Sequence, residues 1–118
     1  MKVLGTSVPI FANDLESAID RYEALTGETV TQRFELPERG IRIALLGSLT
    51  IIAGPATGLG VLKDVRATFV VDSLADYEAH LRATGATVVQ GPSQTPAGTN
   101  LIVRDLDGVV LEFVEVQG

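Results

Sequence analysis

The residue types that most often carry chemistry are scarce in this chain of 118 residues. It has no cysteine, which excludes disulfides, thiol catalysis and cysteine-based metal sites. Its single histidine, His80, falls on a predicted helix, where we expect it to be exposed to solvent. The glycine-rich stretch "GPATGLG" (54–60) lacks the Gly-Lys-Ser/Thr ending of a phosphate-binding loop, so we interpret it as a linker.

The composition is that of a soluble globular protein with an acidic surface. Hydrophobic residues make up 46% of the chain and charged residues 20%, which supplies a core for one domain. The formal net charge of −6 would repel a phosphate backbone, so we expect no nucleic-acid partner, whereas cationic small molecules are weakly favoured. No apolar run is long enough to span a membrane, and "MKVLGTSVPIF" lacks the long apolar region of a signal peptide. We therefore expect a cytoplasmic protein that does not bind membranes.

Two similar heptads indicate an internal repeat. "TGETVTQ" occupies residues 26–32 and "TGATVVQ" residues 84–90, about half the chain apart. In each heptad the glycine is suited to end a helix, and the Thr-Val pair is suited to begin a strand. The heptads are therefore interpreted as one structural joint used twice, with no chemistry of their own.

The elements around each heptad follow the same order. In the first half we predict a strand at 3–12, a helix at 13–27, a strand at 28–36, a turn at 37–40, and strands at 41–46 and 49–53. In the second half we predict a strand at 65–71, a helix at 72–85, a strand at 86–90, a loop at 91–99, a strand at 100–104, a turn at 105–108 and a strand at 109–116.

Both predicted helices carry capping signals and a single apolar stripe. Asn13 with Glu16, and Ser73 with Asp76, have the spacing of an N-cap and a reciprocal acidic residue. The expected buried stripes are Leu15, Ala18, Ile19, Tyr22 and Leu25 on the first helix, and Leu74, Tyr77 and Leu81 on the second.

The element order predicts an α+β fold made of two βαβββ modules. Module one covers 1–54, the linker 55–62 and module two 63–118. Because neither module is large enough to bury a sheet face alone, we expect the two modules to pack into a single domain.

This organisation resembles the vicinal oxygen chelate superfamily, which includes glyoxalase I, extradiol dioxygenases and bleomycin resistance proteins. The paired βαβββ order covers the whole chain, and "NDLESAIDRYEALTG" is similar to the first helix of that superfamily. "RDLDGVVLEFVE" is similar to its closing strand motif, with Leu106 in place of a proline. The resemblance implies that each module curls into half of an open barrel and that a ligand lies in the cleft between the modules.

The resemblance also implies where a metal would bind in metal-dependent members. The four ligand positions fall on Ser7, on Ile51 or Ile52, on Arg66 and on Glu112. Only Glu112 is a good ligand, since isoleucine has no donor atom and a guanidinium repels a cation. We therefore predict that the protein binds no metal there and uses no cofactor.

Strand alternation then predicts which residues share the cleft face. The expected sets are Ser7, Pro9 and Phe11 on the first strand, Arg66, Thr68 and Val70 on the fifth, and Val110, Glu112 and Val114 on the last. We hypothesise an Arg66–Glu112 ion pair in place of the metal, because a buried charge is tolerated when it is paired. The pair either orients a polar ligand or only satisfies an inherited carboxylate.

The opening "SVPIF" is similar to bleomycin resistance proteins, which lack the metal ligands and sequester a drug. The resemblance implies a homodimer in which the first strand is exchanged near Pro9, and a proline is compatible with a strand edge or break. The alternative is an ordinary edge-strand proline in a monomer. Since the chain has no tryptophan, Phe11 and Phe34 are the best candidates for stacking on a ligand, whereas Phe69 and Phe113 are expected in the core.

The leading hypothesis is a metal-independent protein of the antibiotic resistance or sequestration type, which binds a hydrophobic or cationic small molecule. Its candidate contacts are Ser7, Phe11, Phe34, Arg42, Arg66, Thr68 and Glu112. The alternative is a metal-free isomerase, lyase or cyclase in which Glu112 is the acid or base and Arg66 stabilises negative charge. A metal-dependent glyoxalase or dioxygenase would need ligands that the sequence does not offer.

Overall fold

The computed structural model describes residues 1–116, and the chain divides into two compact units. The first unit comprises residues 8–63, and the second unit comprises residues 1–7 together with the chain from residue 64 onward. The opening strand, β1 (Val3–Ala12), is shared, because its residues 3–7 belong to the second unit and its residues 8–12 to the first. None of the helices in residues 1–116 is long and apolar enough to cross a membrane.

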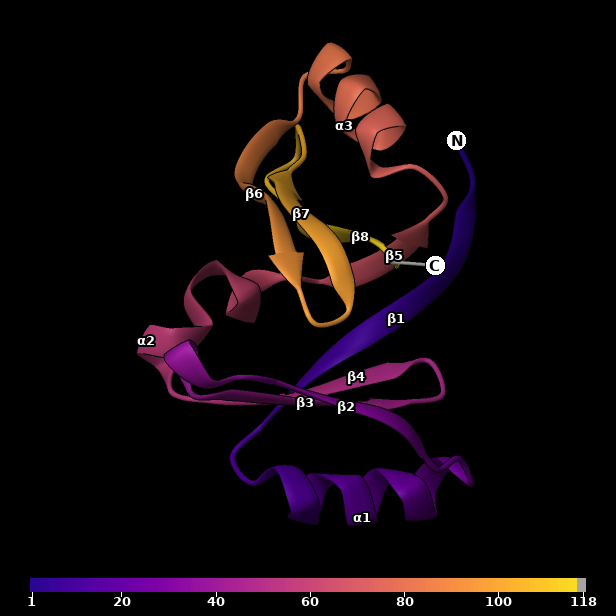
Figure 1. The fold of residues 1–118 in the computed structure, drawn as a ribbon, viewed down its shortest axis with the longest axis vertical. Coiled ribbons are helices and arrows are strands. Elements are labelled where there is room, and N and C mark those ends of the chain that lie inside the picture. Colours follow the sequence, from indigo (N-terminus) through magenta and orange to yellow (C-terminus); the bar gives the residue numbers. More distant parts are fainter. Residues whose placement is uncertain (117–118) are drawn as a thin grey trace. The chain divides into compact units, whose positions relative to one another are not determined.

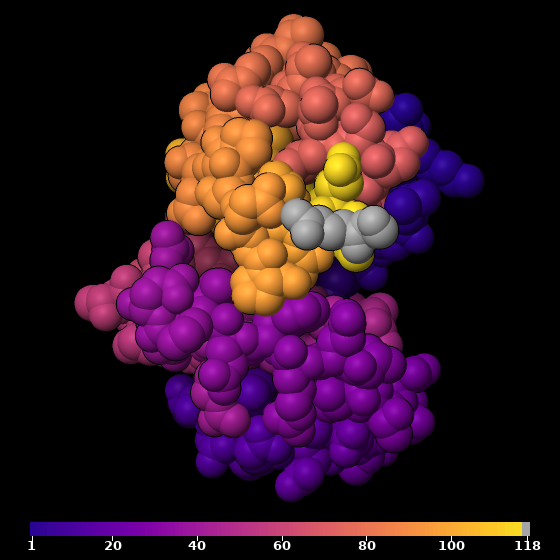
Figure 2. Space-filling view, in the orientation of Figure 1, coloured from indigo at the N-terminus to yellow at the C-terminus, as the bar shows by residue number. Residues whose placement is uncertain are grey.

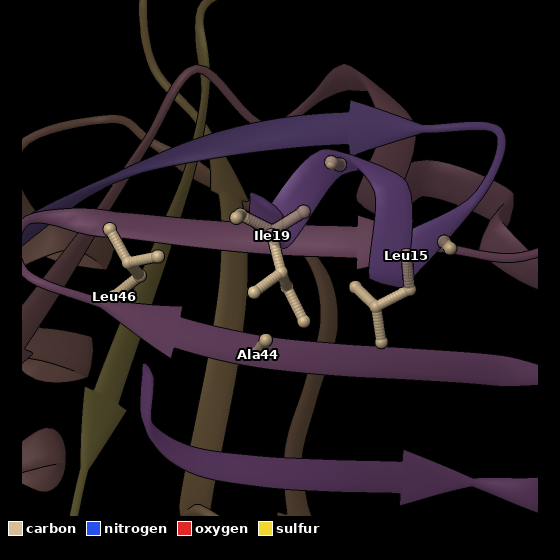
Figure 3. Close-up of a cluster of buried hydrophobic side chains, with 7 residues drawn as sticks. Leu15, Ile19, Ala44 and Leu46 are labelled. Carbon is tan, nitrogen blue, oxygen red and sulfur yellow. The ribbon is translucent and has the colours of Figure 1, made fainter. Parts of the chain in front are cut away.

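The first unit is a four-stranded sheet with one long helix on one face (Figure 1). Its elements are α1 (Leu15–Thr26), β2 (Val30–Leu36), β3 (Ile41–Leu46) and β4 (Leu49–Ala53). Hydrogen bonding gives the order β2-β3-β4-β1, in which β1 runs parallel to β4. The core that α1 covers consists of Leu15, Ala18, Ile19, Ala44, Leu46, Ile51 and Ala53 (Figure 3).

Helix α1 begins one residue later than the capping signal predicted. The N-cap is Asp14 and not Asn13, and its carboxylate accepts the backbone N–H of Ser17 at 3.3 Å. Gly27 ends the helix as expected, since its φ of 74° is left-handed and its N–H bonds the Glu23 carbonyl oxygen. The predicted stripe holds except at Leu25, which is 76% exposed near the end of the helix.

The predicted linker is folded within the first unit. It forms α2 (Ala56–Leu59) and the 3-10 turn η2 (Gly60–Asp64), next to a second 3-10 turn, η1 (Pro37–Arg39), that follows β2. Leu59 is buried against Ile41 and Ile52 on the sheet face opposite α1. Apolar residues among the glycines therefore give this segment a place in the core.

The second unit repeats the plan with a longer hairpin (Figure 1). Its elements are β5 (Ala67–Val71), α3 (Leu74–Ala83), β6 (Thr87–Thr95), β7 (Gly98–Arg104) and β8 (Val110–Glu115). Hydrogen bonding gives the order β1-β5-β8-β7-β6, in which β5 is antiparallel to β1 and parallel to β8. The α+β class and the βαβββ order of each half are therefore confirmed.

Helix α3 packs on one face of this sheet through the predicted stripe. Ser73 caps the helix, since its hydroxyl accepts the N–H of Asp76 at 3.3 Å. The core under the helix consists of Val71, Leu74, Leu101, Val103 and Phe113, with Phe69, Tyr77 and Leu81 packed against it. The ring of Phe113 lies 5.4 Å from that of Phe69 and 5.6 Å from that of Tyr77, which confirms both phenylalanines as core residues.

The loop predicted at 91–99 is wrong, because β6 continues through Thr95 and forms a hairpin with β7. The register shifts between Gln90 and Ser93, where Gly91 has a φ of 94°. A Cβ at Gly91 would lie 2.6 Å from the Asn100 carbonyl oxygen, so glycine permits the close approach. An edge strand tolerates glycine and proline at such a bulge, and this hairpin lies at the molecular surface (Figure 2).

We expect Gly58→Ala to destabilise the fold by about 1–3 kcal/mol. A Cβ at Gly58 would collide with the backbone carbonyl oxygen of Arg39, and neither backbone segment is free to move like a side chain. Urea unfolding monitored by circular dichroism measures the effect. Gly5→Ala is the matched control, because nothing lies within 4 Å of its Cβ, and it should change stability by less than about 0.5 kcal/mol. Equal stability of the two variants would contradict the prediction.

Candidate functional site

A row of cross-strand neighbours runs across the second unit on the sheet face opposite α3. The registers pair Ser7 with Thr68, Thr68 with Glu112, Glu112 with Ile102, and Ile102 with Gln90. Residues that alternate with this row, such as Phe113, pack under α3. The row therefore places one carboxylate among hydroxyl and amide groups on one face of the sheet.

The carboxylate of Glu112 is held at both oxygens by neutral donors. The Thr68 hydroxyl donates to Oε1 at 2.9 Å, and the Asn100 side-chain amide donates to Oε2 at 3.0 Å. Thr68 and Asn100 are only 8% and 9% exposed, and Glu112 is half-buried. Because both donors are packed in the sheet, the carboxylate has one fixed position.

Asn100 brings one acceptor to the site that has no partner. Its Nδ2 must face Glu112, since the carboxylate oxygens only accept hydrogen bonds. Its Oδ1 is buried and makes no hydrogen bond with any residue that the structure describes. A buried acceptor without a donor costs about 1–3 kcal/mol. One acceptor of the site is therefore left without a donor among the described residues.

The predicted Arg66–Glu112 ion pair is not formed in the structure. Across residues 1–116, no ion pair involves Glu112, and Arg66 is exposed. Arg66 lies just before β5, where its backbone N–H bonds the Val110 carbonyl oxygen at 2.9 Å. The strand register matches Glu112 with Thr68, two residues further along, so the hydroxyl takes the position expected for the guanidinium. Arg66 is therefore not part of the Glu112 cluster.

Arg42 lies on the α1 side of the first unit and not on the face that carries Phe34. It alternates with Ile41 and Ile43, and its guanidinium lies 3.3 Å from Glu16 on α1 and 3.9 Å from Glu35. Arg33 joins the same exposed cluster with a 2.7 Å contact to Glu16. Arg42 therefore belongs to an exposed ion-pair cluster on the α1 side of the sheet, away from Phe34 and from Glu112, and its contact with a ligand stays a prediction.

Phe11 and Phe34 share the face of the first unit opposite α1. The registers run from Phe11 to Ile52, from Ile52 to Ile43, and from Ile43 to Phe34. With strands about 4.8 Å apart, the two rings are roughly 14 Å apart along this apolar row and form no stacked pair. Each ring is at least partly exposed, and its contact with a ligand stays a prediction.

The positions that hold a metal in metal-dependent relatives do not fit a metal here. Ser7 and Glu112 share the row described above, whereas Arg66 carries a positive charge and Ile52 has no donor atom. No cluster of three or more His, Asp or Glu side chains suited to a metal occurs within residues 1–116. His80 is exposed on α3, outside the row.

Asn100 is the residue that sequence reasoning missed. The pattern "NLIVR" predicts a strand there but does not indicate that the Asn100 amide belongs to the site. The available signal was alternation, since Asn100 and Ile102 share a face while Leu101 and Val103 pack under α3. Only the register of β7 against β8 shows that the Asn100 amide reaches Glu112.

The closing motif "RDLDGVVLEFVE" contains a tight turn that Asp105 and Gly108 stabilise. In the turn between β7 and β8, the Asp105 carboxylate accepts the N–H groups of Asp107 and Val109, both at 2.9 Å, and Gly108 has a φ of 83°. This turn fixes the start of β8 and hence the position of Glu112.

The family model of the Glyoxalase/Bleomycin resistance protein/Dioxygenase superfamily matches residues 5–113. The chain belongs to this superfamily. The resemblance inferred from the motifs is confirmed, whereas the closer likeness to bleomycin resistance proteins stays a prediction.

Solved structures with the superfamily fold include one at 32% sequence identity, an uncharacterized protein from Methanosarcina mazei. It has a TM-score of 0.85, with 99% of this chain and 95% of that chain covered. Methylmalonyl-CoA epimerase from Mycobacterium tuberculosis is 23% identical, with a TM-score of 0.80 and coverages of 98% and 90%. A Streptomyces coelicolor methylmalonyl-CoA epimerase variant in complex with 2-nitronate-propionyl-CoA is 21% identical, with a TM-score of 0.77 and coverages of 99% and 100%. At this identity the epimerases show a shared fold alone. No curated protein sequence matched the chain.

The exposed ion-pair cluster of Glu16, Arg33 and Arg42 can be tested through the pKa of Glu16. The hydrogen bond from the Arg33 guanidinium lowers the pKa of Glu16, so Arg33→Met should raise that pKa toward its usual range. A carboxyl whose pKa is lowered by folding adds stability above its unfolded pKa, and the contribution is lost as pH falls through the folded pKa. The stability of the variant should therefore depend less on pH in the acidic range.

A carbon-detected NMR titration of the side-chain carboxyl of Glu16 measures the shift. Arg82→Met is the matched control, because Arg82 pairs with Glu78 on α3 and leaves Glu16 untouched. An unchanged Glu16 titration in Arg33→Met would show that the cluster does not form in solution.

Proposed function

We propose that this protein is a metal-independent small-molecule-binding protein, and that Glu112 binds the cationic part of its ligand. The observation that supports this is a half-buried carboxylate held by two neutral donors, with no positively charged partner among residues 1–116. Hydrogen bonds fix such a carboxylate but leave its charge uncompensated, and a partly buried charge favours an opposite charge nearby. The net charge of −6 favours the same class of ligand.

The ligand also has an apolar part in this proposal. Ile102, Val110 and Val114 lie on the same sheet face as Glu112, and all three are buried. Apolar neighbours lower the local dielectric constant and strengthen the attraction between Glu112 and a cation. With no tryptophan for stacking, we infer a ligand that is smaller or more aliphatic than bleomycin. Binding without chemical change fits a resistance or sequestration role.

The second candidate is a metal-free isomerase, lyase or cyclase with Glu112 as acid or base. It is favoured by the fixed position of this carboxylate and by the fold shared with methylmalonyl-CoA epimerases. It ranks second because Arg66, the group expected to stabilise negative charge, is not brought to Glu112. Methylmalonyl-CoA in D₂O tests the isomerase form of this second candidate. An enzyme would accelerate deuterium uptake at the acidic carbon over the protein-free rate, and Glu112→Gln would abolish the acceleration, whereas a binding protein would leave the rate unchanged.

The cation proposal predicts that Glu112→Gln weakens binding of benzyltrimethylammonium by about tenfold, or 1.4 kcal/mol. The substitution removes the charge and keeps the shape of the side chain. Titration followed by ¹H–¹⁵N NMR measures the affinity and locates the affected residues. Asp107→Asn is the matched control, because it removes one carboxylate from an exposed turn outside the row. Equal affinity of Glu112→Gln and the unmodified protein would overturn the proposal.

We also propose that the protein is a homodimer formed through β1. Apolar side chains are exposed along this strand, with Leu4 at 60% and Val8 at 47%, and Pro9 has no N–H to donate. Exposed apolar groups favour burial against a second copy. Exchange of the first strand near Pro9 is one way in which such a dimer forms.

Sedimentation should accordingly give particles of twice the 12.5 kDa chain mass at micromolar concentration. Leu4→Asp is expected to give the single-chain mass, because a charge would be buried without a partner. Leu25→Asp places the same change at an exposed position of α1 and should remain dimeric. A single-chain mass for the unmodified protein would rule the dimer out.

A further inference from the structure

The second heptad ends in Gln90, which a β-bulge in β6 turns away from α3. Val88 pairs with Val103, and both pack under α3. Gln90 pairs with the neighbouring Ile102, so one extra residue of β6 lies between the two pairs. In a regular strand Gln90, two residues after Val88, would face α3 as well. The bulge instead places Gln90 on the sheet face that carries Glu112.

The first heptad has the same bulge in β2. Val30 pairs with Leu46, and both belong to the core that α1 covers. Gln32 pairs with the neighbouring Leu45, so one residue is again extra and Gln32 faces away from α1. The two heptads therefore share a bulge as well as a joint. The row of Gln90 contains Glu112, whereas the row of Gln32 continues through Leu45, Thr50 and Pro9.

Gln90 and Glu112 lie on either side of an apolar residue. Ile102 lies between them on β7 and is 1% exposed, whereas Gln90 and Glu112 are both partly exposed. With strands about 4.8 Å apart, the backbones of Gln90 and Glu112 are about 10 Å apart. Both side chains can therefore be reached from solvent on one face, where one carries a negative charge and the other a neutral amide.

We propose that Gln90 is a specificity-determining residue, which binds a neutral hydrogen-bonding group, such as an amide, at the end of the ligand opposite its cation. This inference rests on the proposed binding of a cation at Glu112. The Gln90 amide both donates and accepts, so it matches both groups of a ligand amide. A ligand carboxylate would use only the donor and would be repelled by Glu112. The ligand class is an aliphatic amine with a neutral polar end, whose chain lies over Ile102.

The expected contribution of Gln90 to affinity is modest. Because the side chain is partly exposed, its amide is hydrated in the free protein. Ligand binding exchanges hydrogen bonds with water for hydrogen bonds with the ligand, and only the difference counts toward affinity. Gln90 is therefore expected to select among cations that Glu112 already attracts.

The test compares two primary amines with the same aliphatic chain and the same charge at neutral pH. They are hexylamine and ε-aminocaproamide, in which an amide replaces the terminal methyl group. Titrations followed by ¹H–¹⁵N NMR give the amide preference, defined as the ratio of the affinity for ε-aminocaproamide to that for hexylamine. The side-chain NH₂ signals of Gln90 should shift with ε-aminocaproamide, because the amide gains a new partner, and much less with hexylamine.

Two matched variants locate the source of the preference. Gln90→Met keeps the length of the side chain and removes its amide, so the amide preference should fall about fivefold, or ~1 kcal/mol at 1.4 kcal/mol per tenfold. Gln32→Met makes the same change at the corresponding bulge of β2 and should leave the preference unchanged. The ratio cancels any effect that a variant has on both probes alike.

Each outcome decides between the proposed function and the role of Gln90. If both amines bind and Glu112→Gln weakens both, but Gln90→Met keeps the amide preference, the proposed function stands and the role of Gln90 is overturned. An equal fall in Gln32→Met would overturn that role as well. If neither amine binds, the proposed function and this inference fall together. Should Gln90→Met not fold, Gln90 NH₂ signals that respond equally to both amines in the unmodified protein would overturn the inference.

Discussion

The position of Glu112 between Thr68 and Asn100 is the constraint on which the site depends. Three strands meet there, since Thr68 lies on β5, Glu112 on β8 and Asn100 on β7. Each donor reaches the carboxylate only because the registers of β5 and β7 against β8 place it beside Glu112. A slip of one residue would turn the carboxylate into the core under α3, where no such donors are in place.

The two units use the same plan for different surfaces. In the first unit, the sheet face opposite its helix carries an apolar row that ends in Phe11 and Phe34. In the second unit, the corresponding face carries Glu112 in a row that contains Ser7, Thr68 and Gln90 together with the apolar Ile102. The repeated heptads at 26–32 and 84–90 belong to the joints that create this plan, where Gly27 ends α1 and Gly85, with a φ of 97°, follows α3.

Most of the elements were predictable because local signals agree with the tertiary structure. β1 was predicted with its observed bounds, and both helices end near the glycines of the heptads. The prediction failed where tertiary contacts overrule a local signal. Glycine and proline in 91–99 predicted a loop, but a bulge against β7 accommodates them in a strand. Asn13 has the residue type of a cap, but the chain gives the role to Asp14.

By itself, the sequence determined the α+β class and the βαβββ repeat, which follow from periodicity and turn residues. The resemblance carried by the closing motif indicated the superfamily and singled out Glu112, and such a motif is a local property of the chain. Only the tertiary structure decided the partners of that carboxylate. Arg66 and Thr68 lie on one strand two residues apart, and the pairing of β5 with β8 selects the hydroxyl over the guanidinium. The register between β7 and β8 adds Asn100, because hydrogen-bonded strands bring together residues that no local pattern connects.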